Sequence, residues 1–222
     1  MDKVIIIGGK GSAVVIAEQL YDMQVKTGEV EFLGFAFDDE SMGDSINGFP
    51  LLCKTYEAYD KYKDYDDVKF IYQLYRPDLM KERVELLNSL NIPEEKFYTF
   101  IHHTATVARS SEIGKGTAIM ANSVINPNTK IGNHCTIHTS TLIGHDTEIG
   151  DYNFIAAHNV VGSSNKIGNG NFFGLNSTFN NYLKIGDFNF VGMSSNVIKG
   201  LDSNKKVYGN PAKEFDSEIK PI

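Results

Sequence analysis

A histidine followed directly by an aspartate, His145 and Asp146, is the pair in this sequence best suited to acid–base chemistry. Histidine titrates near neutral pH, so its imidazole can take a proton from an attacking amine or hydroxyl group. A neighbouring carboxylate can fix the imidazole tautomer and stabilise the imidazolium that forms. Such a pair suits acyl transfer, in which a base is needed as the tetrahedral intermediate develops. The spacing alone fits an ordinary exposed turn histidine equally well.

A second candidate site lies near the N-terminus, where an apolar run, residues 3–7, ends in a glycine-rich turn. A helical apolar pattern follows at residues 13–23, and the N-terminus of such a helix offers amides to an anionic ligand. A second predicted strand, residues 30–37, ends in two aspartates that can bond a ribose or a base. The predicted substrate-binding residues here are Gly8, Gly9, Gly11, Ser12, Asp38 and Asp39. The glycine spacing is not the full dinucleotide fingerprint, so a domain that only caps the rest of the chain remains the alternative.

A six-residue repeat predicts the strands and corners that must position His145. Every sixth residue from Ile101 to Val197 is apolar, and no insertion breaks the register. With 41% hydrophobic residues, chance produces such a run roughly once in several million tries. A period of six fits neither a helix nor simple strand alternation, but it fits a short strand followed by a corner. Three units make one coil, and we predict a parallel β-helix with one inward side chain per unit.

Stacked coils lie about 4.8 Å apart, which places residues 18 apart above one another. We therefore expect Asn153, Asn171 and Asn189 to stack at one corner. His102 and His138 are two coils apart, or roughly 9.6 Å, which is too far to share an ion directly. We predict no metal site. His138 is expected either to line an acceptor pocket or to lie on an exposed face.

An aromatic cluster follows the candidate base. Its members are Phe172, Phe173, Phe179, Phe188 and Phe190. Since Phe173 and Phe179 fall on inward positions, we predict that the cluster packs inside the β-helix rather than lining a ligand site.

Weaker signals fill the first hundred residues. We predict strands at residues 50–52, 69–74 and 97–100, and helices at residues 55–62 and 77–90. Strands that alternate with helices indicate a parallel sheet. The chain then divides into an α/β domain, residues 1–97, and a β-helix domain with a short C-terminal tail, residues 98–222.

Composition narrows the class of protein. A formal net charge of -7 over 222 residues argues against a nucleic-acid partner. The two cysteines, Cys53 and Cys135, have no metal-like spacing and favour a reducing compartment. No signal-peptide layout is present, and no apolar run approaches the roughly 18 residues that span a membrane. We expect a cytoplasmic protein with no membrane partner.

The sequence resembles the sialic acid O-acetyltransferase type of sugar acyltransferases, which includes the bacillosamine and perosamine N-acetyltransferases. The segments that carry the resemblance are residues 4–9, Gly34-Phe35, Asp38-Asp39, Ile101-His102, Ile143-Gly144-His145-Asp146 and residues 208–213. They extend over nearly the whole chain. The resemblance implies a Rossmann-like domain followed by a left-handed, hexapeptide-repeat β-helix. It also implies a homotrimer, with acetyl-CoA between neighbouring subunits and the nucleotide of a UDP- or dTDP-linked amino sugar in the N-terminal domain.

The resemblance assigns roles to individual residues. His145 becomes the general base and Asp146 the residue that orients it, while relatives commonly carry asparagine at the position of His138, whose acceptor-pocket role stays one of two alternatives. The residues expected to bind the co-substrate are Gly144, Phe154, Gly162 and Lys213. A glycine amide at a corner is expected to stabilise the oxyanion. Lys213 is expected either near the phosphate end of CoA or in a solvated tail.

Three departures from the family pattern leave the acceptor open. Relatives carry histidine at the position of Ser12, proline at that of His103 and often histidine at that of Phe154. The leading hypothesis is N-acetylation of a nucleotide-linked 4-amino sugar. O-acetylation of a sugar or sialic acid is the runner-up, because one base serves both nucleophiles. A non-catalytic trimeric nucleotide-binding scaffold is the third. A carbonic-anhydrase-like β-helix would need a histidine ligand set across subunits and would lack the α/β domain.

Overall fold

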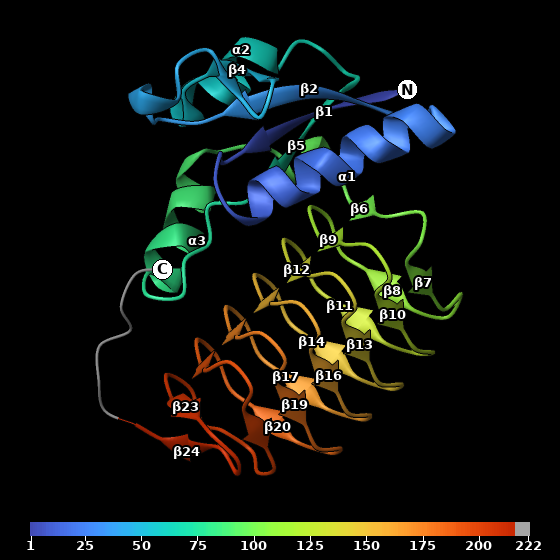
Figure 1. Cartoon of the computed structure of the whole chain (residues 1–222), viewed down its shortest axis with the longest axis vertical. Helices are drawn as coiled ribbons and strands as arrows, with labels where there is room; N and C mark the ends of the chain where they lie inside the picture. The colour runs from blue at the N-terminus through green and yellow to red at the C-terminus, as the bar shows by residue number, and fades with distance from the viewer. Residues whose placement is uncertain (216–222) are drawn as a thin grey trace.

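The computed structural model describes residues 1–215, in which an α/β domain sits on one end of a long β-helix (Figure 1). The strands of the first domain are β1 (Asp2–Ile7), β2 (Val30–Ala36), β3 (Ser45–Ile46), β4 (Phe49–Cys53) and β5 (Val68–Tyr72). They form one sheet of order β3-β4-β2-β1-β5. All neighbours in this sheet are parallel except β3 and β4, which form a hairpin. The parallel sheet expected from the alternating pattern is therefore present.

Helices cover both faces of this sheet. They are α1 (Ser12–Thr27), α2 (Ala58–Tyr62) and α3 (Met80–Ser89), with 3-10 turns η1 (Glu40–Met42), η2 (Thr55–Glu57) and η3 (Glu94–Lys96). Alternate side chains of β1 point to opposite faces, so Val4 and Ile6 pack with α1 while Ile5 and Ile7 pack with Leu87 of α3. A strand that is apolar on both faces is typical of a parallel sheet between two helical layers.

Several predicted boundaries shift by a few residues. The helix predicted at 77–90 begins only at Met80, because residues 76–79 form a turn closed by the Leu79 amide and the Arg76 carbonyl. The helix predicted at 55–62 starts as the 3-10 turn η2. The strand predicted at 97–100 begins at Phe100, and Phe97 forms only a single bridge to Phe70.

From residue 100 onward, two-residue strands recur every six residues and form three parallel sheets around a common core. The first sheet, here called the aromatic face, contains β6 (Phe100–Ile101), β9 (Ala118–Ile119), β12 (Thr136–Ile137), β15 (Phe154–Ile155), β18 (Phe172–Phe173), β21 (Phe190–Val191), β23 (Lys206–Tyr208) and the antiparallel β24 (Lys213–Glu214). The apolar face contains β7 (Thr106–Val107), β10 (Val124–Ile125), β13 (Leu142–Ile143), β16 (Val160–Val161), β19 (Thr178–Phe179) and β22 (Asn196–Val197). The charged face contains β8 (Glu112–Ile113), β11 (Lys130–Ile131), β14 (Glu148–Ile149), β17 (Lys166–Ile167) and β20 (Lys184–Ile185). The result is a left-handed parallel β-helix (Figure 1).

The register of the β-helix agrees with the predicted 18-residue coil. Ile125 pairs with Ile143, and Ile143 with Val161. The predicted asparagine stack is confirmed, since the Nδ2 atoms of Asn171 and Asn189 each donate to the Oδ1 atom of the asparagine one coil earlier, at 3.0 Å. Amide ladders of this kind satisfy polar groups that the core would otherwise leave unpaired.

The prediction of one inward side chain per unit was incomplete. Besides the Ile, Val and Phe column, a second column four residues later is fully buried, for example Thr129 and Ser177. The residue before each of these has a left-handed backbone, with φ 59° at Asn128, which turns the next side chain inward. Small hydroxyl groups fit there because a corner carbonyl accepts their proton: Thr129 Oγ1 donates to Gly144 O at 3.1 Å.

The two domains share one hydrophobic core. Phe100, Ala118 and Met120 of the first coils pack against Ile16 and Ala17 of α1. Helix α1 consequently lies between the sheet and the β-helix (Figure 1). This contact fixes the N-terminal turn relative to the coils. Within residues 1–215, no helix combines the length and apolar character needed to cross a bilayer.

Candidate functional site

His145 and Asp146 occupy the corner between β13 and β14, where the apolar and charged faces meet. Strand β13 ends in the buried Ile143, Gly144 is also buried, and the two residues after it, His145 and Asp146, are exposed. Asp146 adopts a left-handed backbone, φ 57°, which swings its carboxylate toward the preceding side chain. His145 Nδ1 lies 2.6 Å from Asp146 Oδ2. The predicted pair is therefore in direct contact.

The carboxylate of Asp146 is held from two sides. Its second oxygen, Oδ1, accepts a hydrogen bond of 2.9 Å from Asn128 Nδ2, one coil earlier. The hydrogen bond from His145, followed by that from Asn128, lowers the pKa of Asp146. An ionised carboxylate can only accept, so in the neutral form of His145 the proton is on Nδ1 and the lone pair on Nε2. This tautomer leaves Nε2 available as a base. Sequence reasoning missed Asn128, although its 18-residue spacing from Asp146 was a usable signal.

An apolar cavity of about 960 Å³ lies along the aromatic face. Its aromatic wall is a ladder in which Phe154 stacks on Phe172 at 4.8 Å and Phe172 stacks on Phe190 at 5.8 Å, measured between ring centroids. The expectation of simple packing holds for Phe173 and Phe179, which are buried in the core. It is wrong for Phe172 and Phe190, because neighbouring residues of a strand point to opposite faces. The 18-residue spacing of the three ladder rings could have shown this.

His138 also lines the apolar cavity, from the corner between β12 and β13. Its Nδ1 atom is buried, and no hydrogen-bond partner for it exists among residues 1–215. Burial lowers the pKa of His138, so its imidazole is neutral at neutral pH. An unpartnered polar atom in an apolar wall is suited to orient a ligand. His138 therefore lines a cavity rather than an exposed face, and whether that cavity takes the acceptor stays a prediction.

The glycine-rich turn leads from β1 into α1 beside this cavity. A side chain at Gly8 would place Cβ 2.7 Å from the carbonyl oxygen of Gln73, and one at Gly9 would clash with Phe37, so only glycine fits. Gly11 faces the apolar cavity. Ser12 Oγ donates to Gln73 Oε1 at 3.0 Å, and Gln73 Nε2 donates to Thr136 of the β-helix at 2.9 Å. The turn is thereby tied to the aromatic face.

A small basic cavity of about 260 Å³ adjoins the same turn. Lys10, Arg76 and Arg83 line it together with Gln73 and Tyr75. Arg83 Nε is buried and has no hydrogen-bond partner among the described residues. Lys10 and Arg76 pair with Asp39 and Asp78 at 2.6 Å and 2.7 Å, so the unused Arg83 donor is the group most available to an anion. This cavity was not predicted from the sequence, because its cations come from two separate loops and a helix that only the fold brings together.

The predicted aspartates lie at the end of β2, in a neighbouring cavity of about 360 Å³. Asp39 is bound by Lys10 Nζ at 2.6 Å and by the hydroxyl and amide of Ser41. The hydrogen bond from Lys10 is the largest of the effects that lower the pKa of Asp39 to about 2. Asp38 accepts a bond of 3.3 Å from the Thr55 amide. Both carboxylates therefore already have partners within the chain.

The residues expected at the co-substrate site divide into two groups. Phe154 lines the apolar cavity. Gly144 and Gly162 do not offer free amides, because these donate to the carbonyls of Val161 and Phe179 in the β-ladder. The expected oxyanion role of a corner glycine amide is thus not supported at these two positions. Lys213 is exposed on β24 and lies outside the lining of the cavity, which Tyr208 and Phe215 reach instead.

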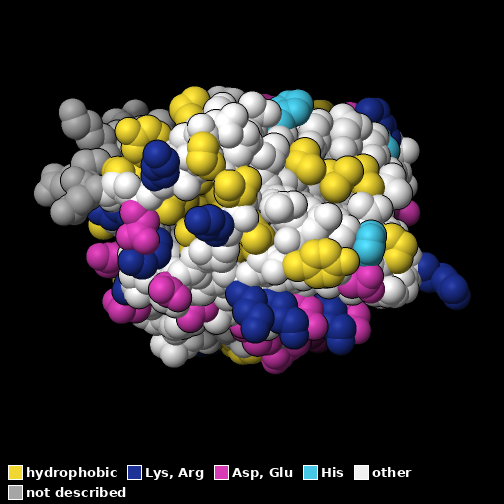
Figure 2. All heavy atoms as spheres, turned by 90° about the horizontal axis from the view of Figure 1, so that it is seen from below, with side chains coloured by type: hydrophobic (Ala, Val, Ile, Leu, Met, Phe, Trp, Pro, Cys, Tyr) yellow, Lys and Arg dark blue, Asp and Glu magenta, His cyan; other side chains and the backbone are white. Residues whose placement is uncertain are grey.

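The structure does not bring His145 and the apolar cavity together within one chain. They lie at opposite edges of the apolar face, whose outward side chains include Leu142 and Val160, 37% and 45% exposed. The charged face differs, since ion pairs such as Glu112–Lys130 at 3.3 Å cross its strands. Figure 2, seen from below, shows charged side chains of both signs gathered along one side of the molecule, with hydrophobic side chains elsewhere. The apolar face is therefore the one suited to be covered.

Comparison with known proteins supports the fold. The family model described as bacterial transferase hexapeptide (six repeats) matches residues 110–145 and 128–163. A mutant of perosamine N-acetyltransferase from Caulobacter crescentus, in complex with CoA and GDP-perosamine, superposes with a TM-score of 0.83 at 22% identity, covering 98% of both chains. The acetyltransferase domain of PglB from Neisseria gonorrhoeae gives 0.80 at 22% identity, covering 97% of this chain and all of that one. WeeI from Acinetobacter baumannii gives 0.77 at 20% identity, with coverage of 97% and 100%.

No curated protein sequence matches this chain. The structural matches confirm the resemblance predicted from the sequence: the α/β domain and the β-helix follow the same plan from end to end.

Proposed function

We propose that this protein transfers the acetyl group of acetyl-CoA to the amine of a nucleotide-linked amino sugar. The observation that carries the proposal is the His145–Asp146 pair, in which a carboxylate held by Asn128 fixes the imidazole tautomer on an outer corner of the β-helix. The fold supports the choice of donor and acceptor, because it matches that of an acetyltransferase in complex with CoA and GDP-perosamine.

In this reaction Nε2 of His145 takes a proton from the sugar amine as its nitrogen attacks the thioester carbon. The carbon–sulfur bond then breaks, and the proton passes from the imidazole to the departing sulfur, which leaves an amide on the sugar. Asp146 stabilises the imidazolium between the two proton transfers. General base catalysis of this kind contributes roughly 10²- to 10⁴-fold in rate.

The apolar cavity on the aromatic face is the proposed site of the acyl donor. Its Phe154–Phe172–Phe190 ladder provides an extended apolar surface, and His138 and Tyr208 provide polar groups at its wall. Small-molecule sites combine such surfaces with a few polar atoms.

We also propose a homotrimer with its active sites between subunits, and the position of two features on one chain supports it. His145 lies at one edge of the apolar face, and the apolar cavity with Gly11 lies at the other. If the apolar faces of three chains turn toward a common axis, one chain's His145 edge meets the next chain's cavity edge, and the ring closes. This arrangement completes the site and covers Leu142 and Val160.

The N-terminal domain is the proposed site of the acceptor's nucleotide. Lys10, Arg76 and Arg83 line the basic cavity, which suits its phosphates. The glycine-rich turn connects the two cavities, since Lys10 lines the basic one and Gly11 lines the apolar one. Asp38 and Asp39 lie close by for a ribose or a base, although a ligand would have to compete with their present partners.

Calorimetry on the full chain tests the acceptor class. We expect UDP, dTDP or GDP to bind, and Arg83→Gln to weaken that binding at least tenfold, since a charge-assisted hydrogen bond contributes about 1.5–3 kcal/mol. Arg109→Gln is the matched control, because Arg109 is exposed on the first coil. Asp39→Ala tests the aspartates separately. If none of the three nucleotides binds, the acceptor is not nucleotide-linked. Acetylation of hydroxyl but not amino sugars would instead support the O-acetyltransferase alternative.

A further inference from the structure

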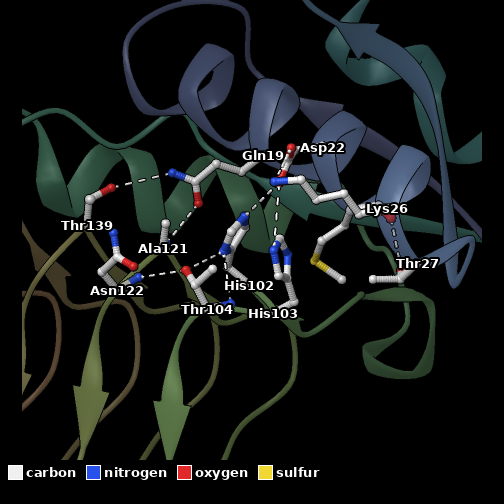
Figure 3. A network of polar contacts seen from close by, with 11 residues as sticks. Gln19, Asp22, Lys26, Thr27, His102, His103, Thr104, Ala121, Asn122 and Thr139 are labelled. Atoms are coloured by element: carbon white, nitrogen blue, oxygen red, sulfur yellow. Dashed lines mark hydrogen bonds and ion pairs between the residues drawn. The ribbon is translucent and has the colours of Figure 1, made fainter.

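Two adjacent histidines and one aspartate converge where the two domains meet (Figure 3). His102 and His103 follow β6 on the first coil, and Asp22 lies on α1 of the other domain. The Nε2 atoms of His102 and His103 lie 3.6 Å and 3.9 Å from Asp22 Oδ2. All three ligand atoms are within 4.8 Å of one another.

These separations are close to those of a tetrahedral metal site. Zn²⁺ binds histidine nitrogen and carboxylate oxygen at about 2.0–2.2 Å, which puts neighbouring ligand atoms about 3.3–3.5 Å apart. Contraction by a few tenths of an ångström brings each histidine–Asp22 pair to that spacing, and the ligand atoms of the two histidines, at most 4.8 Å apart, must also draw closer. Two imidazoles with one carboxylate are a donor set typical of zinc and other divalent transition metals.

The side chains are held in position for this role. The His102 ring is buried, and its Nδ1 atom lies 2.8 Å from Thr104 Oγ1, which also accepts the Asn122 amide at 3.1 Å. With a metal on Nε2, Nδ1 carries the proton and donates it to that hydroxyl, a common outer-shell contact of metal-binding histidines. In this structure the Thr104 amide donates to Nδ1 at 3.2 Å, so a metal on Nε2 replaces that hydrogen bond with one from Nδ1 to the Thr104 hydroxyl.

The helix that carries Asp22 is equally well fixed. The Gln19 side chain accepts the Ala121 amide at 3.0 Å and contacts Thr139 Oγ1 at 3.4 Å, so α1 is bonded to the coils one turn away from Asp22 (Figure 3). Burial, more than the neighbouring His103, lowers the pKa of His102, and this favours the neutral imidazole that a metal needs.

Lys26 is the group that competes with a metal. Its ammonium lies 2.8 Å and 2.9 Å from the two oxygens of Asp22 and is 57% exposed, so it can move into water when an ion enters. Since a hydrogen bond from Lys26 is the largest influence lowering the pKa of Asp22, the carboxylate is already ionised.

We propose that Asp22, His102 and His103 bind a divalent transition metal ion, with Zn²⁺ the best match, and that this ion ties α1 to the first coil of the β-helix. The prediction of no metal site considered whether His102 could share an ion with His138, which lies two coils away. The set found here instead joins neighbouring histidines to a carboxylate of the other domain, a contact that only the fold creates. The fourth position is left to water, since His103 and Asp22 are partly exposed.

Titration of the full chain with ZnCl₂ after chelator treatment tests the proposal. We expect one Zn²⁺ per chain, a rise in Tm on binding, and binding weakened at least about tenfold in His103→Ala and Asp22→Asn. Lys26→Met should bind at least as tightly as the native chain, because it removes the competing cation. His158→Ala is the control, since it removes an imidazole from a turn elsewhere on the β-helix.

Co²⁺ gives an independent readout, because tetrahedral coordination produces a visible absorption spectrum. That spectrum should appear in the native chain and in His158→Ala, and it should be lost in His103→Ala. Circular dichroism of each metal-free variant verifies folding, and His103→Asn replaces any variant that fails it. No Zn²⁺ binding by the native chain, or equal affinity in His103→Ala, overturns the proposal.

Discussion

Replacing His145 with alanine separates catalysis from folding with little ambiguity. The side chain is 59% exposed, and the backbone bond from Ser164 N to the His145 carbonyl does not depend on it. Substitutions at such surface positions change the free energy of unfolding by about 0.5 kcal/mol or less. The imidazole, by contrast, is the proposed base, and its loss should lower kcat on the order of 10²- to 10⁴-fold. That range corresponds to about 2.7–5.5 kcal/mol in the activation free energy.

A graded series of variants sharpens this expectation. Asp146→Asn keeps an oxygen that can accept the Nδ1 proton but removes the charge, and in this exposed pair the loss should be roughly tenfold or less. Asn128→Ala removes only the bond to Asp146 Oδ1 and should have the smallest effect. The steady-state rate of CoA thiol release ranks these variants by their loss of activity, with His158→Ala as the control. Near-normal turnover by folded His145→Ala would refute the assignment of the base.

Four further outcomes are expected. The native chain should be trimeric and Val160→Asp monomeric in light scattering, because the substitution places a charge on the apolar face; an active native monomer would contradict the proposed trimer. Phe172→Ala should raise KM for acetyl-CoA about tenfold or more with little change in kcat, since it removes one ring of the ladder; an unchanged KM would place the donor elsewhere. Acetyl transfer should survive EDTA, because among the described residues the candidate metal ligands Asp22, His102 and His103 lie apart from His145; an EDTA-sensitive rate would reveal a catalytic metal. The free energy of unfolding should be fully retained above pH ~6.5 and should fall below it, because burial lowers the pKa of His134 and the unfolded chain then takes up a proton that the folded chain does not. Urea denaturation on either side of that pH measures this, and His134→Asn should show a smaller fall.

The β-helix was predictable because its signal is local and repeated. An apolar residue every sixth position requires the same short strand at every turn, so even the asparagine stack of residues 153, 171 and 189 follows from spacing. His145 and Asp146 were found for a similar reason. Adjacent residues at a corner must lie close together whatever the rest of the chain does.

The features that sequence reasoning missed are those that depend on contacts between distant segments. Lys10, Arg76 and Arg83 meet only because β1 and β5 end near the first turn of α3. Asp22 reaches His102 only because α1 packs on the first coil. The aromatic ladder is an intermediate case, since its spacing was visible but the outward direction of Phe172 required the strand to be placed.

The most direct test incubates the purified full chain with acetyl-CoA and a panel of UDP-, dTDP- and GDP-linked 4-amino sugars, followed by mass spectrometry of the sugar and measurement of released thiol. We expect at least one amino sugar to gain a single acetyl group on its amine, with one thiol released per acetyl group, and we expect this activity to fall on the order of 10²-fold or more in His145→Ala. Failure to acetylate any member of the panel, or equal turnover by His145→Ala, would contradict the proposed function.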